Sequence, residues 1–119
     1  MKTILVDTNI ILWTFSGGPD FREAIADVAP NYDIVIPTCI IFELEKLKTK
    51  ESLAALEICK KLKQKNIGEG YADDMLVIAA KKGHIIATND KEILKTLKKC
   101  KINALRTRGK KALIMTEVL

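Results

Sequence analysis

The sequence predicts an α/β fold, in which a central, mainly parallel sheet of about five strands is flanked by helices on both faces. Short apolar runs typical of buried strands, such as residues 3–6, alternate with longer segments whose apolar residues recur at helical spacing. Strands that alternate with helices favour right-handed crossovers, and therefore a parallel sheet covered on both sides. An acidic residue also stands shortly after several of the strand runs.

Each expected strand is a short apolar run bounded by residues that turn the chain. Pro37 closes the second run, and Gly83 stands just before the third. In chain order, we expect strands over residues 3–6, 33–36, 84–88, 102–105 and 112–116, of which the last two are weaker.

Six longer segments carry the helical period. The loop Gly17-Gly18-Pro19 separates the first two, Pro30 ends the second, and Gly83 is suited to the left-handed cap that ends the fifth. In chain order, we expect helices over residues 8–15, 20–29, 38–48, 51–65, 73–82 and 91–100.

Length and composition predict a single domain over residues 1–119. A chain of 119 residues with 48% apolar content is long enough to bury one core, and it contains no repeat or linker. The apolar run before Asp7 is too short for a signal peptide, and no later run reaches membrane length, so we expect no membrane association. Three scattered cysteines, Cys39, Cys59 and Cys100, indicate reduced thiols in a cytoplasmic protein.

The net charge of +5 is concentrated in the last quarter of the chain. For any single lysine a solvated helix face explains the charge, but the clustering as a whole predicts a polyanionic partner. The basic residues of this region are Lys91, Lys95, Lys98, Lys99, Lys101, Arg106, Arg108, Lys110 and Lys111.

Four acidic residues are expected near the carboxyl ends of strands, where side chains from distant segments converge. They are Asp7, Glu43, Asp73 and Asp90. Each aspartate taken alone is better explained as a helix cap. Glu43 is different, because it lies beside the apolar stripe of its helix. A carboxylate in that position must be paired, protonated or bound to a cation. If Lys46 is its partner, no cation is needed. Together, four carboxylates in one crevice predict a Mg²⁺ or Mn²⁺ site.

Phosphodiester hydrolysis suits such a site, since divalent ions neutralise phosphate charge and activate water without a histidine base. The lone His84 is better explained as structural. There is no Walker-type glycine loop for a nucleotide, and the cysteines lack the partners of a thiol nucleophile.

The motifs resemble the PIN-domain nucleases in order and spacing over nearly the whole chain. They are Ile4-Leu5-Val6-Asp7-Thr8-Asn9, Ile36-Pro37-Thr38 leading to Glu43-Leu44, Ala72-Asp73-Asp74, and Ala87-Thr88-Asn89-Asp90. Within the family, the tandem Asp73-Asp74 and the basic segment 106–111 resemble archaeal proteins similar to nucleases of small-subunit ribosomal RNA processing. Toxin nucleases of toxin–antitoxin pairs are the near alternative.

The resemblance implies a divalent-metal-dependent endoribonuclease that cuts single-stranded or structured RNA. By position, Asp7, Glu43, Asp73 and Asp90 match the acidic metal ligands, with Asp73 preferred over Asp74. Supporting roles fall to Thr8, Asn9, Asp74 and Thr88, for which turn and cap hydrogen bonds are an equally good explanation. RNA contacts are expected from Tyr71, Arg106, Arg108, Lys110 and Lys111, whereas Trp13 and Phe15 are better explained as core residues. A homodimer, an antitoxin and a ribosome-assembly protein are the partners to consider.

Two other classes remain open. A catalytically inactive PIN module would bind RNA or an assembly partner through its basic face, which the complete acidic set argues against. A phosphoacceptor domain also clusters aspartates at strand ends, but it needs two acidic residues near the amino terminus, where Asp7 stands alone.

Overall fold

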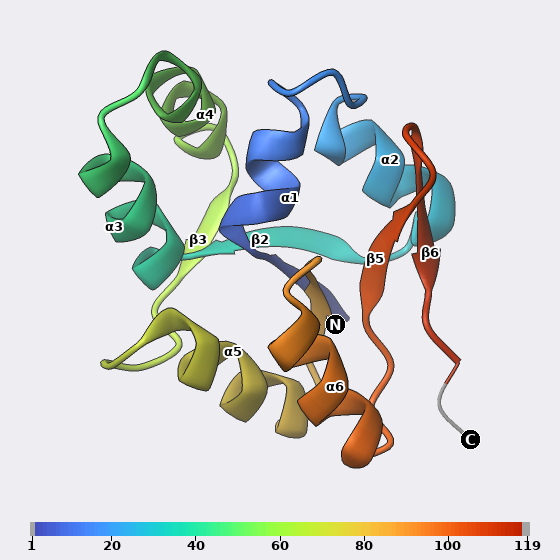
Figure 1. Cartoon of the computed structure of the whole chain (residues 1–119). Helices are drawn as coiled ribbons and strands as arrows, with labels where there is room; N and C mark the ends of the chain where they lie inside the picture. The colour runs from blue at the N-terminus through green and yellow to red at the C-terminus, as the bar shows by residue number, and fades with distance from the viewer. Residues whose placement is uncertain (1, 118–119) are drawn as a thin grey trace.

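Six strands form one sheet in the order β3-β2-β1-β4-β5-β6, and this sheet organises the rest of the chain (Figure 1). The computed structural model describes residues 2–117. The first five strands in this order run parallel, and the last is antiparallel to its neighbour. The strands are β1 (Thr3–Val6), β2 (Asp33–Pro37), β3 (Lys63–Lys65), β4 (Ile85–Ala87), β5 (Leu105–Arg108) and β6 (Ala112–Met115).

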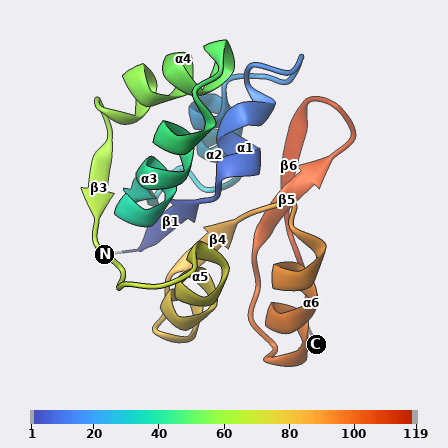
Figure 2. The same ribbon diagram turned by 60° about the vertical axis from the view of Figure 1, so that its left-hand side comes forward.

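Helices cover both faces of the sheet. They form two layers, one on each side of the sheet, as two views of the ribbon show (Figures 1 and 2). This division follows from right-handed crossovers that leave β1 toward β2 and leave β4 toward β5 in opposite directions. The first layer holds α1 (Thr8–Trp13), α2 (Phe21–Val28), α3 (Thr38–Leu47) and α4 (Lys50–Cys59), and the second holds α5 (Ala72–Lys81) and α6 (Lys91–Lys99).

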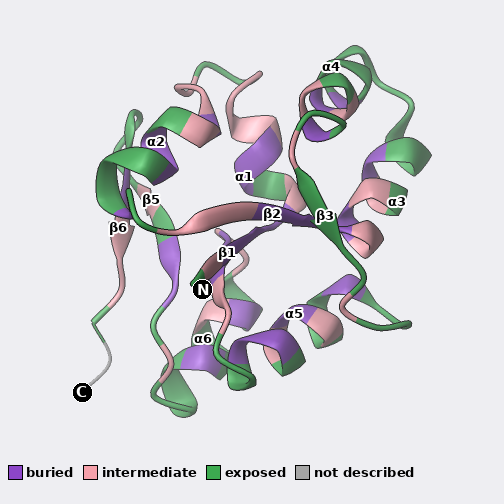
Figure 3. Ribbon diagram, turned by 180° about the vertical axis from the view of Figure 1, so that it is seen from behind, coloured by how far each residue is buried: buried purple, intermediate pink, exposed green. Residues whose placement is uncertain are grey.

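The core lies on both sides of the central strands (Figure 3). Ile4, Leu5 and Val6 of β1 are fully buried, because this strand has a neighbour on each edge and helices on each face. His84 shares a hydrogen bond with Thr3 Oγ1, which ties the start of β4 to β1 and gives this histidine a structural role. None of the helices in residues 2–117 has the length and apolar character that crossing a lipid bilayer requires.

The predicted fold class is confirmed, with one strand more than expected. The segment 51–65 does not stay helical to its end: α4 stops at Cys59, and Lys63, Gln64 and Lys65 pair with β2 as an edge strand. All three residues are exposed, so this strand lacks the apolar alternation by which strands are found in sequences.

The fourth predicted strand, residues 102–105, is shifted toward the carboxyl terminus. Ile102 belongs to the end of α6, where Lys101 takes the left-handed conformation at φ 57°. The Ile102 N–H then bonds to the Leu97 carbonyl and the Lys101 N–H to the Lys98 carbonyl, the pattern of a Schellman cap. Pairing with β6 therefore begins only at Leu105.

Candidate active site

The carboxyl ends of β1 and β4 lie side by side at the centre of the sheet, where the direction of strand order changes. Ligands of open α/β sheets bind at such a switch point, since the crossovers on either side leave in opposite directions. Asp7 directly follows β1, and Thr88, Asn89 and Asp90 directly follow β4. We refer to this edge of the sheet, at Asp7 and residues 88–90, as the carboxylate crevice.

Asp7 is held in place by hydrogen bonds to both carboxylate oxygens. Its side chain is buried, with 5% of the residue exposed. Thr88 Oγ1 donates to Asp7 Oδ2 at 2.6 Å, the Thr8 N–H donates to Oδ1 at 2.8 Å, and Asn9 Nδ2 reaches Oδ2 at 3.4 Å. Because Thr88 is fully buried, the main hydroxyl donor to Asp7 is shielded from water. The carboxylate is thus fixed in orientation at the end of the central strand.

Glu43 reaches the crevice from α3 and is joined to it through Thr8. Thr8 Oγ1 donates to Glu43 Oε1 at 2.5 Å, across 35 residues of sequence. Within residues 2–117, Glu43 forms no ion pair, and in particular none with Lys46. The pairing that would have explained this carboxylate without a cation is therefore absent from the described part of the chain.

Asp90 combines a cap with a place in the crevice. Its Oδ1 accepts hydrogen bonds from the N–H groups of Glu92 and Ile93, so the capping interpretation is correct for this residue. The Asp90 N–H donates to Thr88 Oγ1 at 3.0 Å, which links this turn to the hydroxyl that holds Asp7. Both of these cap bonds go to the same carboxylate oxygen of Asp90.

The capping interpretation is wrong for Asp73. Tyr71 occupies the N-cap position of α5 without a side-chain cap bond, and Asp73 lies inside the first turn. Desolvation raises the pKa of Asp73, and the negative charges of Asp90 and Asp74 raise it further. Asp73 therefore faces other carboxylates without a cap bond in return.

The acidic residues lie within electrostatic range of one another. Burial raises the pKa of Asp7 most strongly; the hydrogen bonds from Thr88 and Thr8 oppose this, and the charges of Glu43 and Asp73 add to it. Three ion pairs form in residues 2–117, namely Arg22 with Asp20, Lys60 with Glu57 and Lys63 with Asp33. None of them involves the crevice, so its negative charge is not balanced by the described cationic side chains.

Oxygen donors from different elements suit a hard divalent cation. In the part of the chain that is described, no three Asp, Glu, His or Cys side chains are already grouped as ligands of one ion. Mg²⁺ does not require such a group, because it is commonly held by one or two carboxylates and completes its shell with water and substrate phosphate. Asp7 with its fixed carboxylate, and Glu43 and Asp73 beside it, fit that mode of binding.

Glu92 is an acidic residue that sequence reasoning missed. With Asp73 and Asp74 it lines a hollow of about 620 Å³ between α5 and α6. Its place in the first turn of α6 is an ordinary one for glutamate, since negative charge there interacts well with the helix dipole. Only the packing of α5 against α6 brings Glu92 near the tandem aspartates.

The amides Asn9 and Asn89 join three strands at the edge of the crevice. Asn9 Oδ1 accepts from the Asn89 N–H, and Asn89 Oδ1 accepts from both the N–H and the hydroxyl of Thr107 on β5. Each of these distances is 3.0 Å. Asn9 was expected to support the loop after β1, and these bonds link it through Asn89 to Thr107.

The residues expected to contact RNA are all exposed. Tyr71 is 83% exposed at the start of α5, two residues before Asp73. Arg106 and Arg108 are exposed on β5, and Lys110 and Lys111 lie in the turn between β5 and β6. By contrast, Trp13 and Phe15 pack against the core, as the alternative interpretation held.

Comparisons with known proteins agree with this fold and show the family. Residues 4–110 match the family model described as a PIN like domain. Ribonuclease VapC4 of Methanocaldococcus jannaschii is 34% identical over an alignment of 123 residues, which covers 93% of this chain and 94% of that protein. Among solved structures, the PIN domain endonuclease Utp24 superposes with a TM-score of 0.85 at 24% identity, covering 98% of this chain and 92% of that one.

The raised pKa of Asp7 predicts how stability depends on pH. A carboxyl whose pKa is raised on folding stabilises the fold below its unfolded pKa and loses that contribution as pH rises through the folded value. In metal-free buffer, Asp7→Asn should therefore unfold with a larger free energy than the wild type at pH 7, and the gap should close as pH falls to about 4. Urea titrations across this range measure the difference. The exposed Asp27→Asn variant is the control, and an Asp7→Asn protein that is less stable at pH 7 would contradict the assignment.

The Thr88 hydroxyl predicts a second effect. Thr88→Val removes the donor to Asp7 Oδ2 and the acceptor of the Asp90 N–H, and it should cost about 1–3 kcal/mol in free energy of unfolding. The pKa of Asp7, followed by NMR of its carboxyl carbon, should rise further because the Thr88 bond lowers it. Thr88→Ser keeps the hydroxyl and should leave the Asp7 titration near that of the wild type. Equal titrations in the valine and serine variants would show that Thr88 does not tune this carboxyl.

Proposed function

Since this chain belongs to the PIN-like domain family, we propose that residues 1–119 form a single nuclease domain that hydrolyses RNA phosphodiester bonds in the cytoplasm with the help of Mg²⁺ or Mn²⁺. The observation that carries this proposal is the buried Asp7 carboxylate, fixed by Thr88 and surrounded by acidic residues without a balancing cation. Such an arrangement is costly for a fold and is retained where charge is needed for function.

The metal site is proposed to consist of Asp7, Glu43, Asp73 and Asp90. When bound, a divalent ion lowers the pKa of water and neutralises charge on the scissile phosphate. Thr88 and Thr8 hold the carboxylates of Asp7 and Glu43 in fixed orientations. Asp74 and Glu92, which share a hollow with Asp73, would maintain the negative potential on the α5 side.

RNA as the substrate is supported by the relative named Ribonuclease VapC4 and by the exposed basic residues of β5 and the turn that follows it. Arg106 and Arg108 lie on β5, the strand that Asn89 contacts, and Lys110 and Lys111 lie in the turn after it. We expect these four residues to bind phosphates. Tyr71 presents a ring beside Asp73 on which one base could stack.

The first test is cleavage of a single-stranded RNA oligonucleotide with Mn²⁺ present. Asp7→Asn and Asp73→Asn should each lower the cleavage rate by about a hundredfold or more. Asp90→Asn is informative, because asparagine keeps the cap of α6 while removing the charge. Asp27→Asn, on the exposed side of α2, is the matched control.

Thermal unfolding gives a second readout on the same proteins. Mn²⁺ should raise the melting temperature of the wild type by mass action and should raise that of Asp7→Asn less. Tight RNA binding without turnover under any divalent ion would favour the inactive RNA-binding module instead.

The tandem lysines of the β5–β6 turn predict a salt effect. If Lys110 and Lys111 contact phosphates, replacing both with glutamine should weaken RNA binding and reduce the slope of log K against log salt by about 1.4. The control is the Lys60→Gln, Lys61→Gln pair, which precedes β3 at the opposite edge of the sheet. An unchanged slope in the first pair would show that this turn does not contact the RNA.

Two biological roles fit the same chemistry. Processing of ribosomal RNA is one of them. A toxin ribonuclease with an antitoxin partner is the other, and the 34% identity to Ribonuclease VapC4 favours it. Expression in a naive bacterial host should arrest growth if the chain is a toxin, and Asp7→Asn should relieve the arrest. Normal growth with active, soluble enzyme would favour the processing role.

A further inference from the structure

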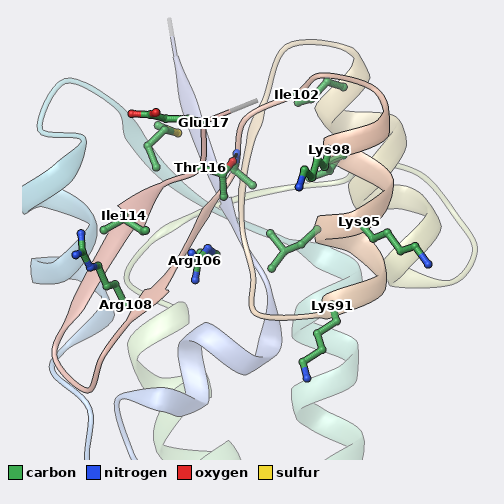
Figure 4. A pocket seen from close by; sticks show the side chains of 13 residues that line it. Lys91, Lys95, Lys98, Ile102, Arg106, Arg108, Ile114, Thr116 and Glu117 are labelled. Atoms are coloured by element: carbon green, nitrogen blue, oxygen red, sulfur yellow. Dashed lines mark hydrogen bonds between the residues drawn. The ribbon is translucent and has the colours of Figure 1, made fainter. Parts of the chain in front are cut away.

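A groove of about 820 Å³ runs between α6 and the β5–β6 hairpin, separate from the carboxylate crevice (Figure 4). No residue that lines it belongs to the acidic set proposed for the metal. The groove exists because α6 covers only part of this face of the hairpin, where Arg106 and its cross-strand partner Ile114 share one side.

The floor of the groove is aliphatic. Leu94, Leu97 and Ile102 contribute from α6 and its cap, and Ala104, Ile114 and Met115 contribute from the hairpin. Leu94, Ile102, Ile114 and Met115 are only half-buried, so part of their apolar surface remains in contact with water. Covering that surface would provide a hydrophobic driving force for binding.

The rim of the groove is basic. Its lining includes five cationic side chains, Lys91, Lys95, Lys98, Arg106 and Arg108, and a single carboxylate, that of Glu117. All five are exposed, and within residues 2–117 none forms an ion pair. The described lining of the groove is therefore strongly positive.

An aliphatic floor with a basic rim favours a protein segment over a nucleic acid as the ligand of this groove. Single-stranded RNA is held by aromatic rings on which bases stack, and none of the Trp, Tyr or Phe side chains lines this groove. Aliphatic floors instead accept leucine-like side chains of an amphipathic segment, whose charges then meet the rim. A volume of about 820 Å³ has room for a few side chains.

We propose that this groove docks an acidic, amphipathic segment of a partner protein, with aliphatic side chains entering between α6 and the hairpin and aspartate or glutamate side chains facing the lysines and arginines of the rim. The proposal does not depend on nuclease activity. It assigns a protein-binding surface to a basic cluster for which the sequence predicts a polyanionic partner, and in which the two arginines are expected to bind RNA.

A display library of short random peptides, selected against the full chain, tests the proposal. The enriched peptides should alternate Leu, Ile, Val or Met with Asp or Glu. On titration with one such peptide, amide shifts in the NMR spectrum should change along α6, β5 and β6, and not around Asp7. Enrichment of basic or uncharged peptides, failure to enrich any sequence, or shift changes elsewhere would overturn the proposal.

Matched substitutions test charge and floor separately. Lys95→Glu should weaken binding of the selected peptide by about tenfold or more, whereas Lys99→Glu on the same helix, outside the groove, should change it much less. Ile114→Gln should weaken it by about tenfold, with the exposed Leu53→Gln on α4 as control. If Ile114→Gln fails to fold, the half-buried Leu94→Ser takes its place. If the peptide binds Ile114→Gln, or Leu94→Ser in its place, as tightly as the wild type, the attraction is nonspecific and electrostatic, and the docking site is refuted.

The same variants separate this surface from the RNA-cleaving function. Lys95→Glu and Ile114→Gln should still cleave single-stranded RNA if the groove serves a protein. Failure of cleavage in the wild type would count against the nuclease proposal and leave peptide binding untouched. Loss of RNA affinity in Ile114→Gln, together with no selected peptide, would assign the groove to RNA instead.

Discussion

The site depends on a carboxyl group that the fold buries without an ion-pair partner in the described part of the chain. Asp7 is fixed at the end of the central strand by Thr88, a fully buried residue from the neighbouring strand. Removing charge from water is expensive unless hydrogen bonds or a counter-ion compensate for it. Hydrogen bonds compensate only in part here, as the raised pKa of Asp7 indicates. The remaining cost is what a bound divalent ion would relieve.

The topology of the sheet explains how residues from distant segments come to the same edge as Asp7. Because β1 to β4 run parallel, the helices that follow β2, β3 and β4 all begin at the same edge of the sheet, where Asp7 also stands. The amino-terminal ends of α3, α5 and α6 therefore direct their partial positive charge toward that edge. This positive potential stabilises the negative charge of the acidic residues, and it also attracts phosphate groups to the same edge.

Features that repeat with a regular period could be predicted from the sequence, and features that depend on packing could not. The central strands and the helices were predictable because their apolar spacing is strong. Glu43 was recognisable as a misfit on its helix, and its bond to Thr8 supports that inference. The cap assigned to Asp73 was wrong, because Tyr71 begins the helix instead. Neither the bond between Asn89 and Thr107 nor the hollow shared by Glu92 and Asp73 leaves a local signal in the sequence.

The short strand β3 has a consequence for self-association. It forms one border of the sheet, where its three residues, Lys63, Gln64 and Lys65, are exposed. If the β3 strands of two molecules paired edge to edge, their lysines would repel one another, and little apolar surface would be buried to offset that repulsion. These charges therefore disfavour edge-to-edge association of the sheet through β3.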